Sequence, residues 1–152
     1  YHYFPSKAKL FHYLVDFALT NSLVGLTATL DTPGTAWERI CALSEMLVQS
    51  VFTAESSLFF HIIFQAITQG KHIPDIPERI RAGIDAYYDA LAPVVQAAQE
   101  AGEAVDGDPR VLAAAYLSSI QGLVTLTFQG LGMETQITAD MLSNILRNGA
   151  QP

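Results

Sequence analysis

The chain has 152 residues, of which half are hydrophobic and 15% are charged, so a disordered chain is excluded and one domain with a substantial core is expected. Its formal net charge of -7 argues against a free-standing nucleic-acid-binding protein, which would carry a basic face. Cys41 is the single cysteine, which excludes an intramolecular disulfide and fits a reducing cytosol, so we expect a cytoplasmic protein.

The chain opens on an aromatic and then basic stretch, residues 1–11. Ser6 is a suitable N-cap, and Lys7 and Lys9 fall in the first helical turn, where the helix dipole disfavours positive charge. An external anion such as a nucleic-acid phosphate would offset that cost. A solvated start to an amphipathic helix explains the same residues, and on chemistry alone it is the simpler interpretation.

This stretch resembles the junction that follows the helix-turn-helix of TetR-family (tetracycline-repressor-like) regulators. The matching residues are Tyr1, Tyr3, Phe4, Ser6, Lys7, Leu10 and Phe11. Ala8 and Lys9 stand where the family usually has an acidic residue. The resemblance implies that residues 1–5 end a DNA-binding domain and that 6–152 form a ligand-binding and dimerisation domain. It also implies DNA phosphate contacts by Tyr1, Tyr3 and Lys7. Since the chain starts without Met inside this motif, we expect a piece of a longer protein.

Apolar residues at helical spacing, separated by capping signals, predict an all-α bundle of about six helices. The first helix is expected over residues 6–29. The second begins at a capping box, in which Thr35 and Glu38 each satisfy an exposed N–H of the first turn. The third is expected from about residue 53 to a stop at Gly70.

The fourth helix is expected to begin at the N-cap Asp75 and to kink near Pro93, because proline lacks a backbone N–H and clashes with the preceding turn. Asp108–Pro109 is the clearest helix start in the chain, and the fifth helix should run to about Gln129. A sixth helix is expected over residues 138–147. No alternating pattern typical of strands interrupts this series.

The fifth helix is unusual because residues 111–133 contain no charged side chain. That length could span a bilayer, but polar residues interrupt it and no basic or Trp cluster follows it, so we expect no membrane partner. Its apolar residues form two stripes, one more than a single core needs. We therefore expect a homodimer through the last two helices, as the resemblance also implies; burial within one chain is the alternative. The expected interface residues are Ala113, Leu117, Val124, Phe128, Met141 and Ile145.

Catalytic and metal-binding patterns are not evident in the sequence. His12 and Asp16 lie one helical turn apart, yet no third ligand follows at a recognisable spacing, so a solvated pair is the better interpretation. Cys41 has no basic or histidine neighbour in sequence that would activate a thiol. We therefore expect no enzyme, no metal and no cofactor.

The middle of the chain instead carries the residues of an apolar pocket, in which a few placed polar groups orient a small molecule. The candidate ligand-binding residues are Trp37, Phe59, Phe60, His61, Phe64, Tyr87, Tyr88, Tyr116 and Ser119. Ordinary core packing explains most of them equally well. The tyrosines and His61 are the better candidates, because a buried hydroxyl or imidazole needs a partner and a ligand can provide it.

The resemblance implies the sensor and dimerisation domain of a TetR-family transcriptional regulator, a repressor that a small apolar or aromatic effector releases from operator DNA. The DNA would be bound through the missing N-terminal domain. Two alternatives remain open: a helical-bundle carrier or enzyme with an apolar pocket, and a helical module that binds another protein.

Overall fold

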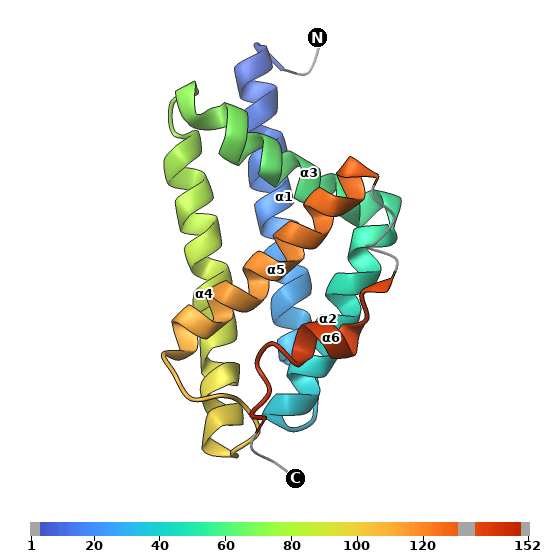
Figure 1. Cartoon of the computed structure of the whole chain (residues 1–152). Coiled ribbons are helices and arrows are strands. Elements are labelled where there is room, and N and C mark those ends of the chain that lie inside the picture. Colours follow the sequence, from blue (N-terminus) through green and yellow to red (C-terminus); the bar gives the residue numbers. More distant parts are fainter. Residues whose placement is uncertain (1–3, 131–135, 150–152) are drawn as a thin grey trace.

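The computed structural model describes residues 4–130 and 136–149, apart from the side chains of residues 54–57 and 128. Within these ranges the chain forms an all-α bundle without a strand, as predicted (Figure 1). The elements are α1 (Lys7–Leu30), α2 (Ala36–Phe52), α3 (Ala54–Gln69), the 3-10 turn η1 (Gly70–His72), α4 (Ile76–Glu100), α5 (Pro109–Gln129) and α6 (Ala139–Ser143).

Three helix starts form through the predicted caps. The Ser6 hydroxyl accepts a hydrogen bond from the Lys9 backbone N–H at 3.2 Å and so begins α1. The capping box of α2 is complete, because the Thr35 N–H donates to the Glu38 carboxylate at 2.7 Å and the Glu38 N–H donates to the Thr35 hydroxyl at 3.2 Å. Asp108 accepts from two backbone N–H groups at the start of α5. Local sequence therefore determines where these helices begin.

The predicted side-chain cap of α4 is wrong. Asp75 stands at the N-cap position, but its φ is 67° and its side chain makes no capping hydrogen bond. The chain turns tightly there, with the Ile76 N–H donating to the Ile73 carbonyl at 3.3 Å, and Asp is one of the few residues that tolerate this left-handed conformation. The helix α4 continues through Pro93, and the kink expected there stays a prediction.

The sixth helix is also shorter than predicted, since α6 ends at Ser143. The chain after it pairs with the loop between α4 and α5 instead. The Val105 N–H donates to the Leu146 carbonyl, and the Asn148 N–H donates to the Glu103 carbonyl, both at 2.9 Å. These two bonds flank an isolated antiparallel bridge, which competes with continued helix and leaves α6 as little more than one turn.

Two hydrophobic clusters hold the bundle together. The large core joins α2, α4, α5, α6 and the end of α1, and its fully buried side chains include Ile40, Leu43, Leu91, Tyr116 and Leu146. The small core joins α1, α3 and the start of α4 through Val15, Leu19, Ala66, Ile76 and Ile80. In Figure 1 the small core lies toward the end of the bundle where α1 begins, and α5 crosses in front of α1. The helix α4 is long enough to take part in both.

In the described part of the chain, α1 is the helix that is long and apolar enough to cross a membrane by length and composition. Core helices of proteins that never meet a bilayer pass the same test. Here α1 contributes Val15 and Leu19 to the small core and Leu26 and Leu30 to the large core. Its apolar character therefore has an explanation in the packing of the bundle.

Candidate ligand pocket

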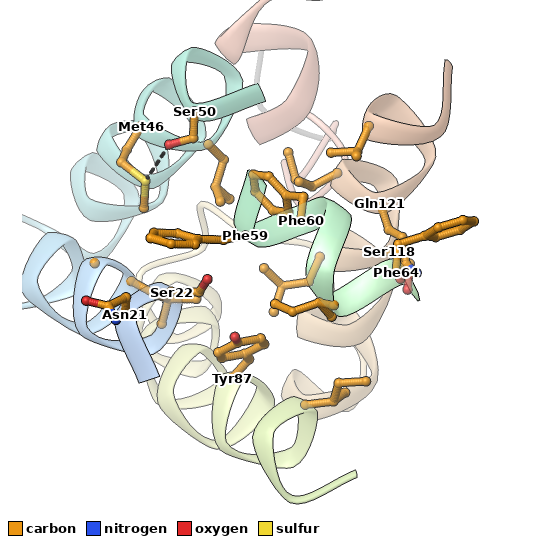
Figure 2. A pocket seen from close by; sticks show the side chains of 18 of the residues that line it. Asn21, Ser22, Met46, Ser50, Phe59, Phe60, Phe64, Tyr87, Ser118 and Gln121 are labelled. Atoms are coloured by element: carbon orange, nitrogen blue, oxygen red, sulfur yellow. Dashed lines mark hydrogen bonds between the residues drawn. The ribbon is translucent and has the colours of Figure 1, made fainter. Parts of the chain in front are cut away.

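A cavity of about 220 Å³ lies between the two cores, with walls from all five long helices (Figure 2). Its lining consists of Asn21, Ser22, Gly25, Leu26, Met46, Leu47, Ser50, Phe59, Phe60, Ile63, Phe64, Ile67, Ile84, Tyr87, Tyr88, Leu117, Ser118, Ile120, Gln121 and Val124. An apolar space of this kind with a few polar groups at its edge is the usual form of a small-molecule site.

The cavity exists because α1 turns small residues toward helices that carry large ones. A Cβ placed on Gly25 would meet no atom within 4 Å, so the space beside that part of α1 is unfilled. Opposite it, α3 contributes Phe59, Phe60 and Phe64. Phe59 also makes an edge contact with Phe17 of α1, with ring centroids 5.7 Å apart. The aromatic wall is therefore attached directly to α1.

Tyr87 is the best-defined polar group of the pocket. Its hydroxyl donates to the backbone carbonyl of Leu19 in α1 at 3.2 Å and hydrogen-bonds to the Ser22 side chain. Burial raises the pKa of Tyr87 to about 12, so the side chain stays neutral near pH 7. Tyr87 packs against both cores. One side chain thus touches the cavity, the backbone of α1 and the two clusters that hold the fold.

Five of the predicted ligand-binding residues line this cavity: Phe59, Phe60, Phe64, Tyr87 and Tyr88. Their aromatic character and helical spacing were sufficient to indicate them. Residues that sequence reasoning missed include Ser22, Gly25, Ser50 and Ser118. The signal that could have found the first two is the run of small residues on one face of α1, since small side chains beside an aromatic helix leave room.

The other four predicted residues lie outside the lining. Tyr116 belongs to the large core, where its hydroxyl and that of Ser44 are 2.6 Å apart. Ser119 donates to the Tyr116 carbonyl at 2.5 Å. Trp37 lies near the start of α2 under the Arg147 guanidinium, 5.3 Å from its ring centroid. His61 is exposed. The structure therefore assigns packing or surface positions to these four.

The predicted interface residues fall into four groups. Ala113 and Val124 are buried within the single chain, so their side chains are already covered. Leu117 lines the cavity, whereas Met141 and Ile145 are 59% and 44% exposed. The Phe128 side chain lies outside the described residues. The free face of α5 is formed by other residues, of which Val111, Ala115, Ser118 and Gly122 are exposed.

The N-terminal positions are only partly described. Tyr1 and Tyr3 lie outside the described residues, and Lys7 is exposed in the first turn of α1. The pair His12 and Asp16 does not form a metal site: His12 Nε2 lies 2.8 Å from the Pro74 carbonyl, and Asp16 forms an ion pair with Arg79. Across the described residues, no group of three His, Cys, Asp or Glu side chains could hold a metal ion.

Comparison with solved structures shows two similar folds. The MbdR regulator from Azoarcus sp. CIB aligns over 100% of this chain and 81% of its own, with a TM-score of 0.72 and 17% identity. A protein of unknown function from Rhodococcus sp. RHA1 aligns over 96% of this chain and 76% of its own, with a TM-score of 0.71 and 19% identity. No protein-family model and no curated protein matches the sequence. The all-α fold predicted from helical spacing and capping signals is thereby confirmed, and the chain shares the helical fold of these two structures.

Proposed function

We propose that this chain is the ligand-sensing and dimerisation part of a cytosolic DNA-binding transcriptional regulator, a repressor that an apolar or aromatic effector releases from its operator. The observation that carries the proposal is that α1 forms one wall of the cavity, through Asn21, Ser22, Gly25 and Leu26. A molecule that enters the cavity must therefore touch the helix that begins at the N-terminal end of the domain.

The mechanism is a shift between two positions of α1. A ligand changes that equilibrium only if it binds one position better than the other. Tyr87 provides the difference, because its hydroxyl bonds the α1 backbone at Leu19 and also faces the ligand space. Movement of α1 in both protomers changes the separation of two DNA-binding modules, which then no longer match half-sites one helical turn apart. Lys7, in the first turn of α1, would lose its phosphate contact in the same movement.

The dimer uses the face that carries α5 and α6. Exposed Val111, Ala115, Ser118 and Gly122 recur three or four residues apart along α5, and the exposed Met141 and Ile145 belong to or follow α6. In Figure 1 both helices lie on the same side of the bundle. Small residues allow two helices to approach closely about a two-fold axis, which gives an isologous contact.

The dimer is tested by light scattering of the wild type and two matched variants. Ala115→Arg places a bulky charge on the proposed interface, and Ala82→Arg places the same charge on an exposed position of α4. We expect twice the chain mass for the wild type and for Ala82→Arg, and a shift toward monomer for Ala115→Arg. A wild-type monomer at micromolar concentration would remove the dimer from the proposal.

The regulator itself is tested with the full gene product and DNA from its own promoter, by fluorescence anisotropy. A small-molecule hit from a thermal-shift screen should release the DNA, and Tyr87→Phe should require more ligand for the same release. Tyr13→Phe is the matched control, because Tyr13 lies outside the cavity lining. A carrier with the same pocket would bind the hit without binding DNA. An unrelated sequence in place of a helix-turn-helix segment upstream of Tyr1 would also refute the regulator.

A further inference from the structure

We propose that the effector is an uncharged, ring-bearing molecule, held at its polar end by the hydroxyls of Ser22 and Tyr87. This inference rests on the proposed function, because it takes the cavity as the sensor site. It adds two properties that an apolar lining alone does not determine: the net charge of the ligand and the end of the cavity at which its polar group lies.

The charge follows from the side chains around the cavity. None of the described lining residues is Asp, Glu, Lys, Arg or His. A charged group moved from water into such a space without a partner loses far more hydration free energy than apolar contacts return. An uncharged hydroxyl, amide or carbonyl loses much less and can be satisfied by one hydrogen bond.

Arg110 is a cation that contacts a lining residue, and two carboxylates already neutralise its charge. Its guanidinium lies over the ring of Tyr88, a lining residue, at 5.7 Å from the centroid. It bonds the Asp85 carboxylate at 2.8 Å and also pairs with Asp89. Two carboxylates therefore oppose one guanidinium on the outer side of this ring. An anionic ligand would have to break those pairs to gain a counter-ion.

The ring preference follows from size and from the wall of α3. The cavity of about 220 Å³ exceeds the roughly 150 Å³ apolar cavity known to take up benzene. Phe59, Phe60 and Phe64 come from a single helix and line one side of it. Aromatic side chains contact a flat ring in offset or edge arrangements better than they contact a flexible chain. A molecule with one or two fused rings fits both observations.

The polar end is determined by which hydroxyls are shielded from water. Figure 2 shows the Ser22 and Tyr87 oxygens on the same side of the cavity. Tyr87 donates its hydroxyl proton to the Leu19 carbonyl, so in its hydrogen bond with Ser22 the Ser22 hydroxyl is the donor. Both oxygens keep a lone pair that can accept from a donor group of the ligand. On the other side, Gln121 is exposed and competes with water, and Ser118 belongs to the face assigned above to the dimer contact. A hydrogen bond is therefore worth more at the Ser22 and Tyr87 end.

Three probes with the same ring system separate the charge states: 2-naphthol, 2-naphthoate and 1-naphthylmethylammonium, titrated into this chain by calorimetry at pH 7. We expect 2-naphthol to bind and each ion to bind on the order of a hundredfold more weakly. Tyr87→Phe should weaken 2-naphthol about two- to tenfold. Tyr13→Phe, outside the lining, should leave its affinity unchanged.

A variant that adds a positive charge to the lining tests the charge preference from the opposite direction. Met46→Lys replaces one unbranched lining side chain by another, and should gain binding of 2-naphthoate because the carboxylate then has a partner. Ser50→Lys, on the same wall, serves if the first variant does not fold. Wild-type binding of 2-naphthoate as tight as that of 2-naphthol, with NMR shifts at Phe59 and Tyr87, would overturn the charge assignment while keeping the sensor site. Binding of 2-naphthol that leaves promoter DNA bound would instead contradict the proposed function alone.

Discussion

The large core and the small core are built differently, although α4 runs through both. In the large core the buried polar side chain Ser44 donates to the Ile40 carbonyl and bonds Tyr116, so its polar atoms are satisfied inside the cluster. The small core contains five buried apolar residues and no such bond among them. Around it lie exposed aromatic side chains, of which Tyr13 and Phe17 contact each other on α1.

This difference indicates which part of the fold can move. The large core holds α2, α4, α5, α6 and the second half of α1 together, whereas the small core holds the first half of α1 against α3 and α4. The cavity lies between them, and Tyr87 packs against both. Elements with fewer buried contacts open at lower free energy, and binding-linked motions use such elements. We therefore expect the first half of α1 to respond to a ligand while the large core, which holds the second half, stays intact.

The largest expected effects come from large-to-small substitutions that create a cavity in each core, and they test whether the two cores differ in rigidity. Leu91→Ala removes a fully buried side chain of the large core and should destabilise the protein by about 2–5 kcal/mol. Val15→Ala, fully buried in the small core, should cost less, about 1–3 kcal/mol, because fewer methyl groups are lost and that cluster can collapse further. Urea unfolding measures both. Equal costs, despite the smaller deletion in Val15→Ala, would mean that the small core is no softer than the large core.

A substitution at the contact between α1 and α4 can push these two helices apart while the large core keeps all its side chains. A Cβ on Gly83 would lie 2.6 Å from Leu19 Cδ2, so these helices approach closely at this position. Gly83→Leu should force them apart and cost about 1–3 kcal/mol through overpacking. Ala82→Leu, at the neighbouring exposed position, is the control and should change stability little. Chemical denaturation checks both; an unaffected Gly83→Leu would show that α1 already moves freely.

Alkaline titration compares the buried tyrosines of the two regions. Burial raises the pKa of Tyr87 to about 12 and that of Tyr116 still further, against an ordinary value near 10. A raised folded-state pKa means that stability is fully present below pH 10 and falls as the pH rises through the folded-state pKa. Absorbance at alkaline pH should show a late phase of tyrosine ionisation, above the ordinary value near 10, and Tyr87→Phe should remove part of its amplitude. An unchanged late phase in Tyr87→Phe would show that burial does not raise the pKa of Tyr87.

The smallest expected effect is that of the ion pair between α1 and α4. Arg79 and Asp16 are 40% and 49% exposed, so water screens their attraction. Arg79→Ala should therefore cost below about 1 kcal/mol, and the cost should shrink further in high salt. Thermal unfolding at two salt concentrations measures it. A loss as large as that of Leu91→Ala would mean that a charge, rather than the small core, holds α1.

Sequence reasoning identified the helices where the local signal was strong. Ser6, the Thr35–Glu38 capping box and Asp108 cap their helices as predicted, because a cap depends on residues three or four apart. It failed where a distant partner decides the conformation. The bond between Val105 and Leu146 ends the helical region early, and no pattern within residues 138–147 could indicate it.

The same distinction applies to the site. An aromatic residue on a helical stripe is recognisable from sequence, and Phe59, Phe60 and Tyr87 were found in that way. Whether such a ring lines a cavity or fills a core depends on the size of the residue opposite. Tyr116 meets Ser44 and is buried, whereas Phe59 lies across from small residues of α1 and borders open space. That pairing is a property of the fold alone.

A short antiparallel bridge joins the loop after α4 to the segment after α6, and this bridge restricts how α5 and α6 can move. It closes a ring of chain that contains α5 and α6, anchored at Ala104 and Arg147. A closed ring has fewer accessible conformations than a free end, so a large movement of α5 away from the end of α4 would have to break these hydrogen bonds. In a dimer joined through α5, the two protomers would then keep a common axis while a ligand acts. In the proposed mechanism the displacement would then fall to α1, which lies outside this ring.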